Sequence, residues 1–196
     1  MMKMKALGLS LATVASLGLL VNLPVQAATD PLAGNSVGEF EVAKGTLTLD
    51  NVPTFAFEGT DVKTLVTQGA DLAYTNDTIK NGTTTGTSLK VSDYRGSDQP
   101  AWNLNAKMSD FTNKTTTITG SLTYVTDGSA TGTVTADDSS VWNNTKALTA
   151  GAGIATAGTA TGTKLALPKT TGVSTGTYDA DLTWTLSSTA SDTASD

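Results

Sequence analysis

Paired carboxylates are the first residues in this sequence that could do chemistry, because glycan hydrolysis can proceed with two acids alone. The closest pairs are Asp137 with Asp138 and Asp179 with Asp181. If residues 177–188 form a strand, Asp179 and Asp181 lie on its polar face, where no apolar pocket would keep an acid catalyst protonated. We therefore interpret them as solvated side chains, and nothing around them matches the spaced oxygen ligands of a calcium loop.

The sequence contains no histidine and no cysteine. The usual zinc sites, Ser-His and Cys-His nucleophile pairs and an imidazole proton shuttle are therefore excluded. We expect a protein that is not an enzyme and that needs no metal or other cofactor. Because disulfides are impossible, the apolar core must hold the fold together.

Arg95 is the only arginine, and it follows Asp93 by two residues. Both side chains fall on one face of a predicted strand. We interpret them as an ion pair, or as a guanidinium hydrogen-bonded to loop carbonyls near residues 101–108. The alternative is that Arg95 contacts a carboxylate of a ligand.

Strands must position these residues, because Thr, Gly, Ser, Asp and Asn crowd the chain and helical apolar spacing is hard to find. The stretch 62–77 is compatible with a short helix or an irregular segment, and the small-residue-rich stretch 147–168 belongs inside the domain as loops and thin strands. We expect an all-β fold with a single antiparallel β-sandwich of Ig-like or Greek-key type. The predicted strands span residues 40–50, 54–59, 88–94, 101–108, 116–126, 132–136, 163–168 and 177–188.

Two of these strands carry the tripeptide Trp-x-Leu, and both have one apolar face and one polar face. In the first, the apolar face consists of Trp102, Leu104, Ala106 and Met108. In the second, it consists of Tyr178, Ala180, Leu182, Trp184 and Leu186. This alternation predicts that both tryptophans lie in the core of a sandwich. The alternative is an exposed platform on which the indole rings stack against sugars.

Trp142 does not belong to an alternating apolar face, since Val141 is its only apolar neighbour in the polar stretch 138–146. We interpret it as the best candidate for an exposed aromatic side chain that contacts a sugar or a partner protein. The alternative is a ring folded over the edge of the core.

The first residues have the pattern of a secretion signal. Lys3 and Lys5 precede an apolar run at 6–21, and an A-x-A-like cleavage site ends at Ala27. That run is shorter than the roughly 20 residues that cross a bilayer, so we expect cleavage and no membrane insertion afterwards. The predicted parts of the chain are a signal peptide at 1–27, a domain at 28–190 and a polar tail at 191–196.

The net negative charge of the chain argues against polyanionic binding partners. The net charge of −6 becomes −8 once the two lysines of the signal are removed. Nucleic acids and anionic lipids are bound by clusters of Lys and Arg, so neither is expected as a partner.

Four segments together resemble the WxL-domain proteins of Gram-positive bacteria. The segments at 102–104 and 178–186 are similar to the two signature motifs of that family, and a proline of the second motif is replaced by Ala190. Two earlier segments are similar to further family stretches. The matching residues are Val52, Pro53, Phe55, Phe57, Val91, Asp93, Arg95, Gly96, Trp102, Leu104, Tyr178, Leu182, Thr183, Trp184 and Leu186.

The resemblance implies a small WxL protein, secreted and held non-covalently on peptidoglycan, with other surface proteins of its locus as partners. On this hypothesis the ligand of Arg95 would be a carboxylate of a peptidoglycan stem peptide. The alternative is an interaction subunit that docks on a larger cell-surface partner through an edge strand or the Trp142 region, so that wall binding is indirect. A carbohydrate-active enzyme is a third and weaker alternative.

Overall fold

The computed structural model describes residues 37–75, 86–96, 100–114, 116–147 and 153–188. The predicted signal peptide at 1–27 and the predicted tail at 191–196 lie outside these ranges. Residues 37–41 form no helix or strand and are exposed, and the compact unit of the chain begins at Val42.

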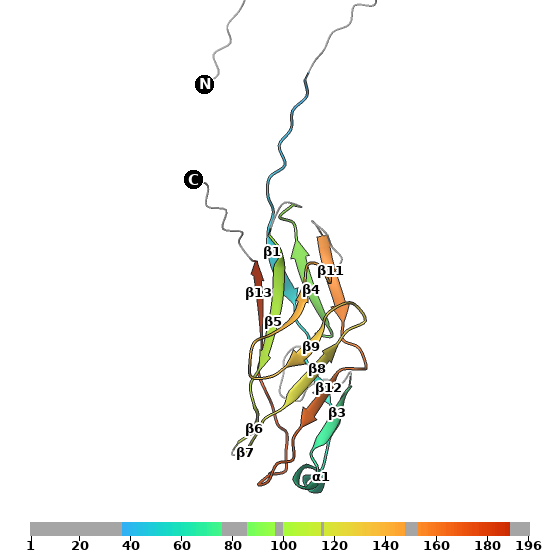
Figure 1. The fold of residues 1–196 in the computed structure, drawn as a ribbon, viewed down its shortest axis with the longest axis vertical. Helices are drawn as coiled ribbons and strands as arrows, with labels where there is room; N and C mark the ends of the chain where they lie inside the picture. The colour runs from blue at the N-terminus through green and yellow to red at the C-terminus, as the bar shows by residue number, and fades with distance from the viewer. Residues whose placement is uncertain (1–36, 76–85, 97–99, 115, 148–152, 189–196) are drawn as a thin grey trace, which may run out of the picture. The chain divides into compact units, whose positions relative to one another are not determined.

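Antiparallel strands make up nearly all the regular structure of this unit, as Figure 1 shows. One sheet has the order β1 (Leu47–Asn51), β4 (Ser88–Asp93), β11 (Gly153–Gly158). A second has the order β10 (Ser139–Asn143), β5 (Trp102–Met108), β13 (Leu182–Ser188). The third has the order β2 (Ala56–Phe57), β3 (Ala70–Thr75), β12 (Lys164–Leu167), β8 (Ser121–Val125), β9 (Thr131–Val134). A separate pair consists of β6 (Phe111–Asn113) and β7 (Thr116–Ile118).

The predicted antiparallel all-β class is therefore confirmed. The three larger sheets share one apolar core, to which strands from each contribute buried side chains. None of the helices in the described ranges is long and apolar enough to cross a bilayer.

The stretch 62–77 contains both a helix and a strand. The helix α1 (Val62–Thr67) begins where the Asp61 carboxylate accepts a hydrogen bond from the Thr64 N–H at 2.9 Å, which caps its first turn. It ends at Thr67, and Gly69, just after the helix, has a φ of 84°, a left-handed conformation that glycine adopts without strain. Strand β3 follows at once, and the sequence pattern did not predict it.

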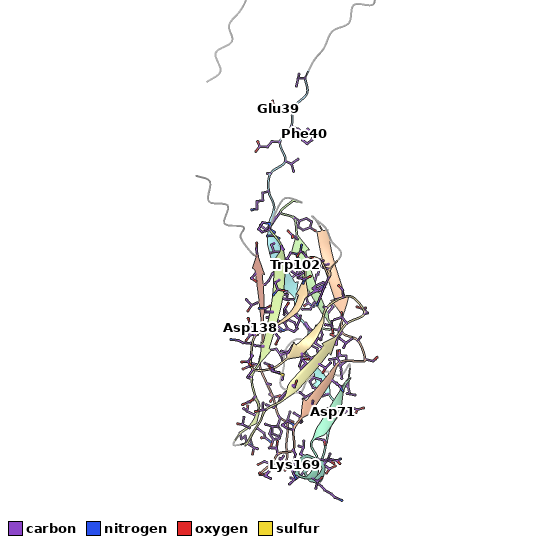
Figure 2. The ribbon with its side chains drawn as sticks, viewed as in Figure 1. Glu39, Phe40, Asp71, Trp102, Asp138 and Lys169 are labelled. Carbon is purple, nitrogen blue, oxygen red and sulfur yellow. The ribbon has the colours of Figure 1, made fainter. Side chains whose placement is uncertain are left out.

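The two Trp-x-Leu segments are neighbouring strands of one sheet. β13 pairs with β5 in continuous register, so that Leu186 is opposite Leu104 and Trp184 is opposite Ala106. The apolar face of β5 is buried, as predicted, and Figure 2 shows Trp102 among the strands. The apolar face of β13 is only half-buried, because β13 is the edge strand of this sheet, yet its side chains pack on the same core. The repeated tripeptide is thus explained by two adjacent strands that share one buried face.

Trp142 is buried, so the prediction of an exposed aromatic side chain there is wrong, and the ring lies inside the core rather than over its edge. Only 2% of the residue is exposed, and its ring meets that of Trp102 edge to face at a centroid distance of 5.6 Å. The pairing of β10 with β5 shifts register between Ser140 and Trp142. This bulge places the consecutive residues Val141 and Trp142 both in the core, which a two-residue alternation cannot predict.

Candidate binding site

Arg95 has a structural role in this fold. Its Nε and Nη2 atoms donate to the two carboxylate oxygens of Asp93 at 2.8 and 2.9 Å, and Nη1 donates to the Ser188 hydroxyl at 2.8 Å. Nη2 also donates to the Pro100 carbonyl at 3.1 Å. The prediction of an ion pair with a carbonyl contact is confirmed, and Arg95, at 8% exposure, is committed to these partners rather than presented to a ligand.

The aspartates of the last strand segment are exposed and anchored through their main chain. The N–H and C=O groups of Asp179 pair with those of Thr112 at 3.1 and 2.8 Å. Asp181 accepts from the Ser109 N–H, and its own N–H donates to the Ser109 hydroxyl, both at 2.9 Å. In the ranges that the structure describes, no group of three or more acidic, His or Cys residues is arranged to hold a metal ion. These contacts fix the path of the segment that leads into β13.

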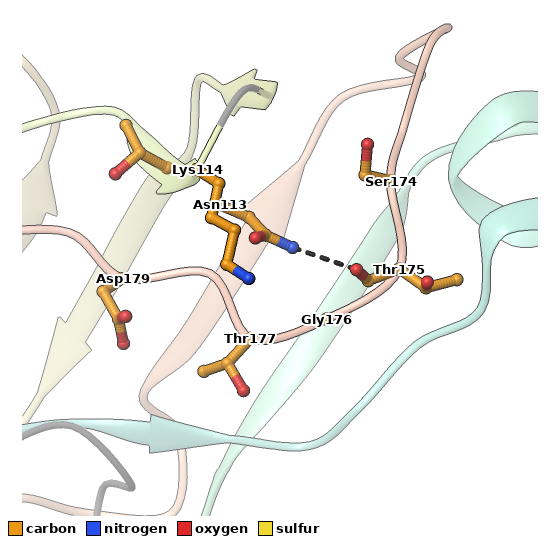
Figure 3. A pocket seen from close by; sticks show the side chains of 8 residues that line it. Asn113, Lys114, Ser174, Thr175, Gly176, Thr177 and Asp179 are labelled. Atoms are coloured by element: carbon orange, nitrogen blue, oxygen red, sulfur yellow. Dashed lines mark hydrogen bonds between the residues drawn. The ribbon is translucent and has the colours of Figure 1, made fainter.

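A polar pocket of about 480 Å³ lies where that segment passes the β6–β7 turn. One wall is the turn itself, and the other is the chain from Ser174 to Asp179 (Figure 3). Its lining offers hydroxyl groups, one amide, one ammonium and one carboxylate. The lining residues are Thr112, Asn113, Lys114, Ser174, Thr175, Gly176, Thr177 and Asp179.

Hydrogen bonds across the pocket hold its walls together. The Asn113 side-chain amide donates to the Thr175 carbonyl at 3.1 Å, and the hydroxyls of Thr116 and Ser174 are 2.8 Å apart. Gly176 has a φ of 136°, and a Cβ atom at this position would lie 2.6 Å from the Asn113 amide nitrogen. A larger residue would therefore break the contact between the two walls.

Lys114 stands at the tip of the turn with a φ of 47°, the only positive φ of a non-glycine residue in the described ranges. Such a backbone is uncommon outside Gly, Asn and Asp. Figure 3 shows its side chain extending into the space between the two walls. The turn thus directs an ammonium group into a pocket of hydroxyls.

Tyr178, a residue of the second motif, shapes this pocket without lining it. Its hydroxyl donates to the Ser174 carbonyl at 2.9 Å and accepts from the Ser174 N–H at 3.1 Å. One phenol therefore closes the loop of residues 174–178. The other motif residues of β13 act differently, since Leu182, Trp184 and Leu186 pack on the core and Thr183 is on the exposed face.

Replacing Tyr178 by phenylalanine removes both hydrogen bonds to Ser174 and keeps the ring. We expect the amide protons of residues 174–177 to exchange with solvent at least about tenfold faster, since this corresponds to losing only about 1.4 kcal/mol of local stability. Hydrogen exchange followed by NMR measures this, and Tyr94→Phe, at an exposed tyrosine, is the control. Unchanged exchange at Ser174 would contradict the assigned role.

The arrangement can bind a polar ligand that carries a carboxylate. The Lys114 ammonium can donate to it, while the threonine and serine hydroxyls can both donate and accept bonds from hydroxyl or amide groups. The sequence did not predict the pocket, because "FTNKTTT" and "VSTGT" are polar turn sequences without a distinctive spacing. The only available signal was Tyr178, whose position in the second motif points to this loop.

The fold and the pocket define the class of this protein, an antiparallel β-sandwich domain with a polar surface site. A family model described as "WxL domain surface cell wall-binding" matches residues 21–190. The chain belongs to this family, and it is an extracellular, cell-wall-associated protein with a cell-wall-binding domain. No curated protein sequence gave a significant match.

Proposed function

We propose that this protein is a non-catalytic, secreted component of a surface protein complex that attaches non-covalently to peptidoglycan through the pocket around Lys114. In this proposal residues 1–27 are removed on export and residues 28–190 form the binding domain. The observation that carries it is the position of the pocket, whose wall is shaped by Tyr178 of the family motif in a domain of the cell-wall-binding family.

The chemistry of the wall fits the lining. Peptidoglycan presents hydroxyl and amide groups on its glycan, and carboxylates on its peptide stems. The Lys114 ammonium supplies a partner for a carboxylate, and the surrounding hydroxyls supply short-range hydrogen bonds. A contact of this kind is weakened by salt, so binding should fall as ionic strength rises.

The residues available argue against catalysis. The chain has no histidine or cysteine, and Asp179 and Asp181 are exposed rather than enclosed by apolar side chains. An acid catalyst for glycan cleavage requires an environment that keeps it protonated near neutral pH. Binding without turnover is the function that this surface supports best.

Replacing Lys114 by alanine is expected to weaken retention on purified, protein-free cell walls by about tenfold, the effect of losing one charge-assisted hydrogen bond. Co-sedimentation of the mature protein with the walls measures this. Lys146→Ala is the matched control, because Lys146 is exposed and outside the pocket. If Lys114→Ala is retained on the walls as strongly as the wild type, the pocket is not the wall-binding site.

A second candidate function is docking on a larger surface protein, with wall binding indirect. It is favoured by β13, an edge strand of seven residues that contains neither proline nor lysine, the residues that usually protect such an edge. Protein-free walls distinguish the two functions. Retention without a partner supports direct binding, whereas its loss, with recovery when membrane proteins of the source cell are added, supports docking.

A further inference from the structure

A second hollow, of about 1000 Å³, opens at the end of the domain that Figure 1 labels α1, β6 and β7. We call it the acidic groove. Its lining comes from β2, α1, β3 and β12 and from β6, β7 and residues 173–182, together with Met108 of β5 and Leu122 of β8. It is distinct from the pocket around Lys114, although residues 174–177 and Asp179 separate the two and line both.

The walls of the acidic groove are more apolar than polar. They include half-buried side chains that pack on the core with one side and leave the other side to the groove. Among them are Phe55, Phe57, Leu72, Phe111, Leu167 and Leu182. An open apolar surface of this kind in a water-exposed domain marks a site of interaction.

Among the residues that the structure describes, the charged side chains lining the groove are all negative. In the described ranges four carboxylates line the groove, and neither lysine nor arginine is among the described lining residues. Glu58, Asp61, Asp179 and Asp181 are all exposed. A field of one sign around an apolar hollow selects an occupant of the opposite charge and repels one of the same charge.

This charge excludes the nearest alternatives. A fatty acid or an acidic peptide would place its carboxylates against those of the rim. A second copy of this chain has a net charge of −6, and its exposed Phe40 stands between Glu39 and Glu41, so it carries the wrong charge as well.

We propose that the acidic groove binds a segment of another protein in which aliphatic or aromatic side chains alternate with lysines or arginines. The apolar side chains enter the groove, and the basic groups meet the carboxylates of the rim. This rests on the proposed membership of a surface complex and gives the chemistry of one of its contacts. In this proposal Phe55 and Phe57, which are similar to a stretch of the family, contact the bound segment.

The test is fluorescence anisotropy with a short labelled peptide in which lysines alternate with leucine and phenylalanine. A second peptide has glutamates in place of the lysines, and a third has serines in place of the apolar residues. We expect saturable binding of the first peptide and at least tenfold weaker binding of the other two, since each loses one of the two complementary features. No binding of the first peptide at millimolar concentration, or equal binding of the third, would overturn the proposal.

Variants locate the contact. Glu58→Gln combined with Asp181→Asn should weaken binding of the first peptide by about fivefold, in the range of exposed charge pairs. Asp137→Asn combined with Asp138→Asn removes two exposed carboxylates that do not line the groove and should leave binding unchanged. Ala180→Phe fills the groove and should reduce binding by more than tenfold. If the Glu58/Asp181 variant binds the peptide as tightly as the wild type, the assignment of the groove is wrong. Both substitutions are at exposed residues, so this result does not depend on changes in the packing of the core.

Retention on cell walls and self-association in sedimentation distinguish the proposed peptide binding from the other possible results. Retention of the Glu58/Asp181 variant on protein-free walls should equal that of the wild type. Lys114→Ala should weaken retention on the walls and leave peptide binding unchanged. The proposal for the pocket and the proposal for the groove can therefore fail independently. Concentration-dependent self-association in sedimentation, abolished by Ala180→Phe and without peptide binding, would assign the groove to a second copy and refute the proposed partner.

Discussion

Replacing Trp102 by alanine is expected to lower the free energy of unfolding by about 4 kcal/mol, because a large buried side chain is lost and a cavity remains. The residue is 1% exposed and lies against the ring of Trp142, at a centroid distance of 5.6 Å and an interplanar angle of 82°. Trp142→Ala should cost a similar amount. Because the rings are in direct contact, the double variant should reveal a coupling energy of about 1 kcal/mol.

Urea denaturation followed by circular dichroism measures these changes. Trp184→Ala is the control, since its ring is half-buried on the edge strand and contacts Tyr124 at 5.8 Å, and it should cost roughly half as much. If Trp102→Ala does not fold, the free energy of unfolding can be measured for the milder variant Trp102→Phe instead. It also removes an indole N–H that is buried without a hydrogen-bond partner in the described part of the chain, which reduces its cost. Equal costs for Trp102→Ala and Trp184→Ala would refute this description of the core.

Replacing Asp93 by asparagine is expected to cost about 2 kcal/mol at pH 7, less than the loss of a fully buried pair because Asp93 retains 13% exposure. The variant leaves the Arg95 guanidinium without its counter-ion. The hydrogen bonds from Arg95 hold the pKa of Asp93 below its ordinary value of 3.8. A carboxyl group whose pKa is lowered on folding stabilises the fold above the unfolded pKa, and this stabilisation is lost as the pH falls through the lowered folded pKa.

The difference in unfolding free energy between wild type and Asp93→Asn should therefore be constant from pH 7 to about pH 5 and shrink below about pH 4. Comparing the two proteins at each pH cancels the titration of the other carboxylates. Asp137→Asn, at an exposed aspartate, should give a difference near zero throughout. A difference for Asp93→Asn that stays constant down to pH 2 would show that the pair does not act through its charge.

The fold could be predicted where strands alternate regularly. β5 is buried at every second residue, and this pattern alone identified both the strand and its inward face. The pattern failed for β10, where the bulge before Trp142 places two consecutive side chains in the core. It also failed for β11, whose buried face is formed by the small residues Ala155 and Ala157, so that its sequence resembles a loop.

The candidate sites were predicted only in part, because they depend on contacts between distant segments. The Arg95–Asp93 pair is local and could be inferred from a spacing of two residues. Lys114 and Ser174 line the same pocket because Thr112 pairs with Asp179, and no short-range pattern encodes that pairing. The acidic groove likewise combines segments from Phe55 to Leu182.

The pairing of β13 with β5 has a consequence for the order in which this protein can fold. Ser188 lies opposite Trp102, and it also accepts a hydrogen bond from Arg95, 93 residues earlier in the sequence. A chain that leaves the cell N-terminus first releases β5 long before β13. Until then β5 lacks one of its two strand partners, so the sheet stays incomplete while the chain is being translocated. Closing it requires contacts between distant residues, and all-β domains of this kind fold on the order of milliseconds to seconds. Without β13, whose first residues belong to the motif at 178–186, this sheet cannot be completed.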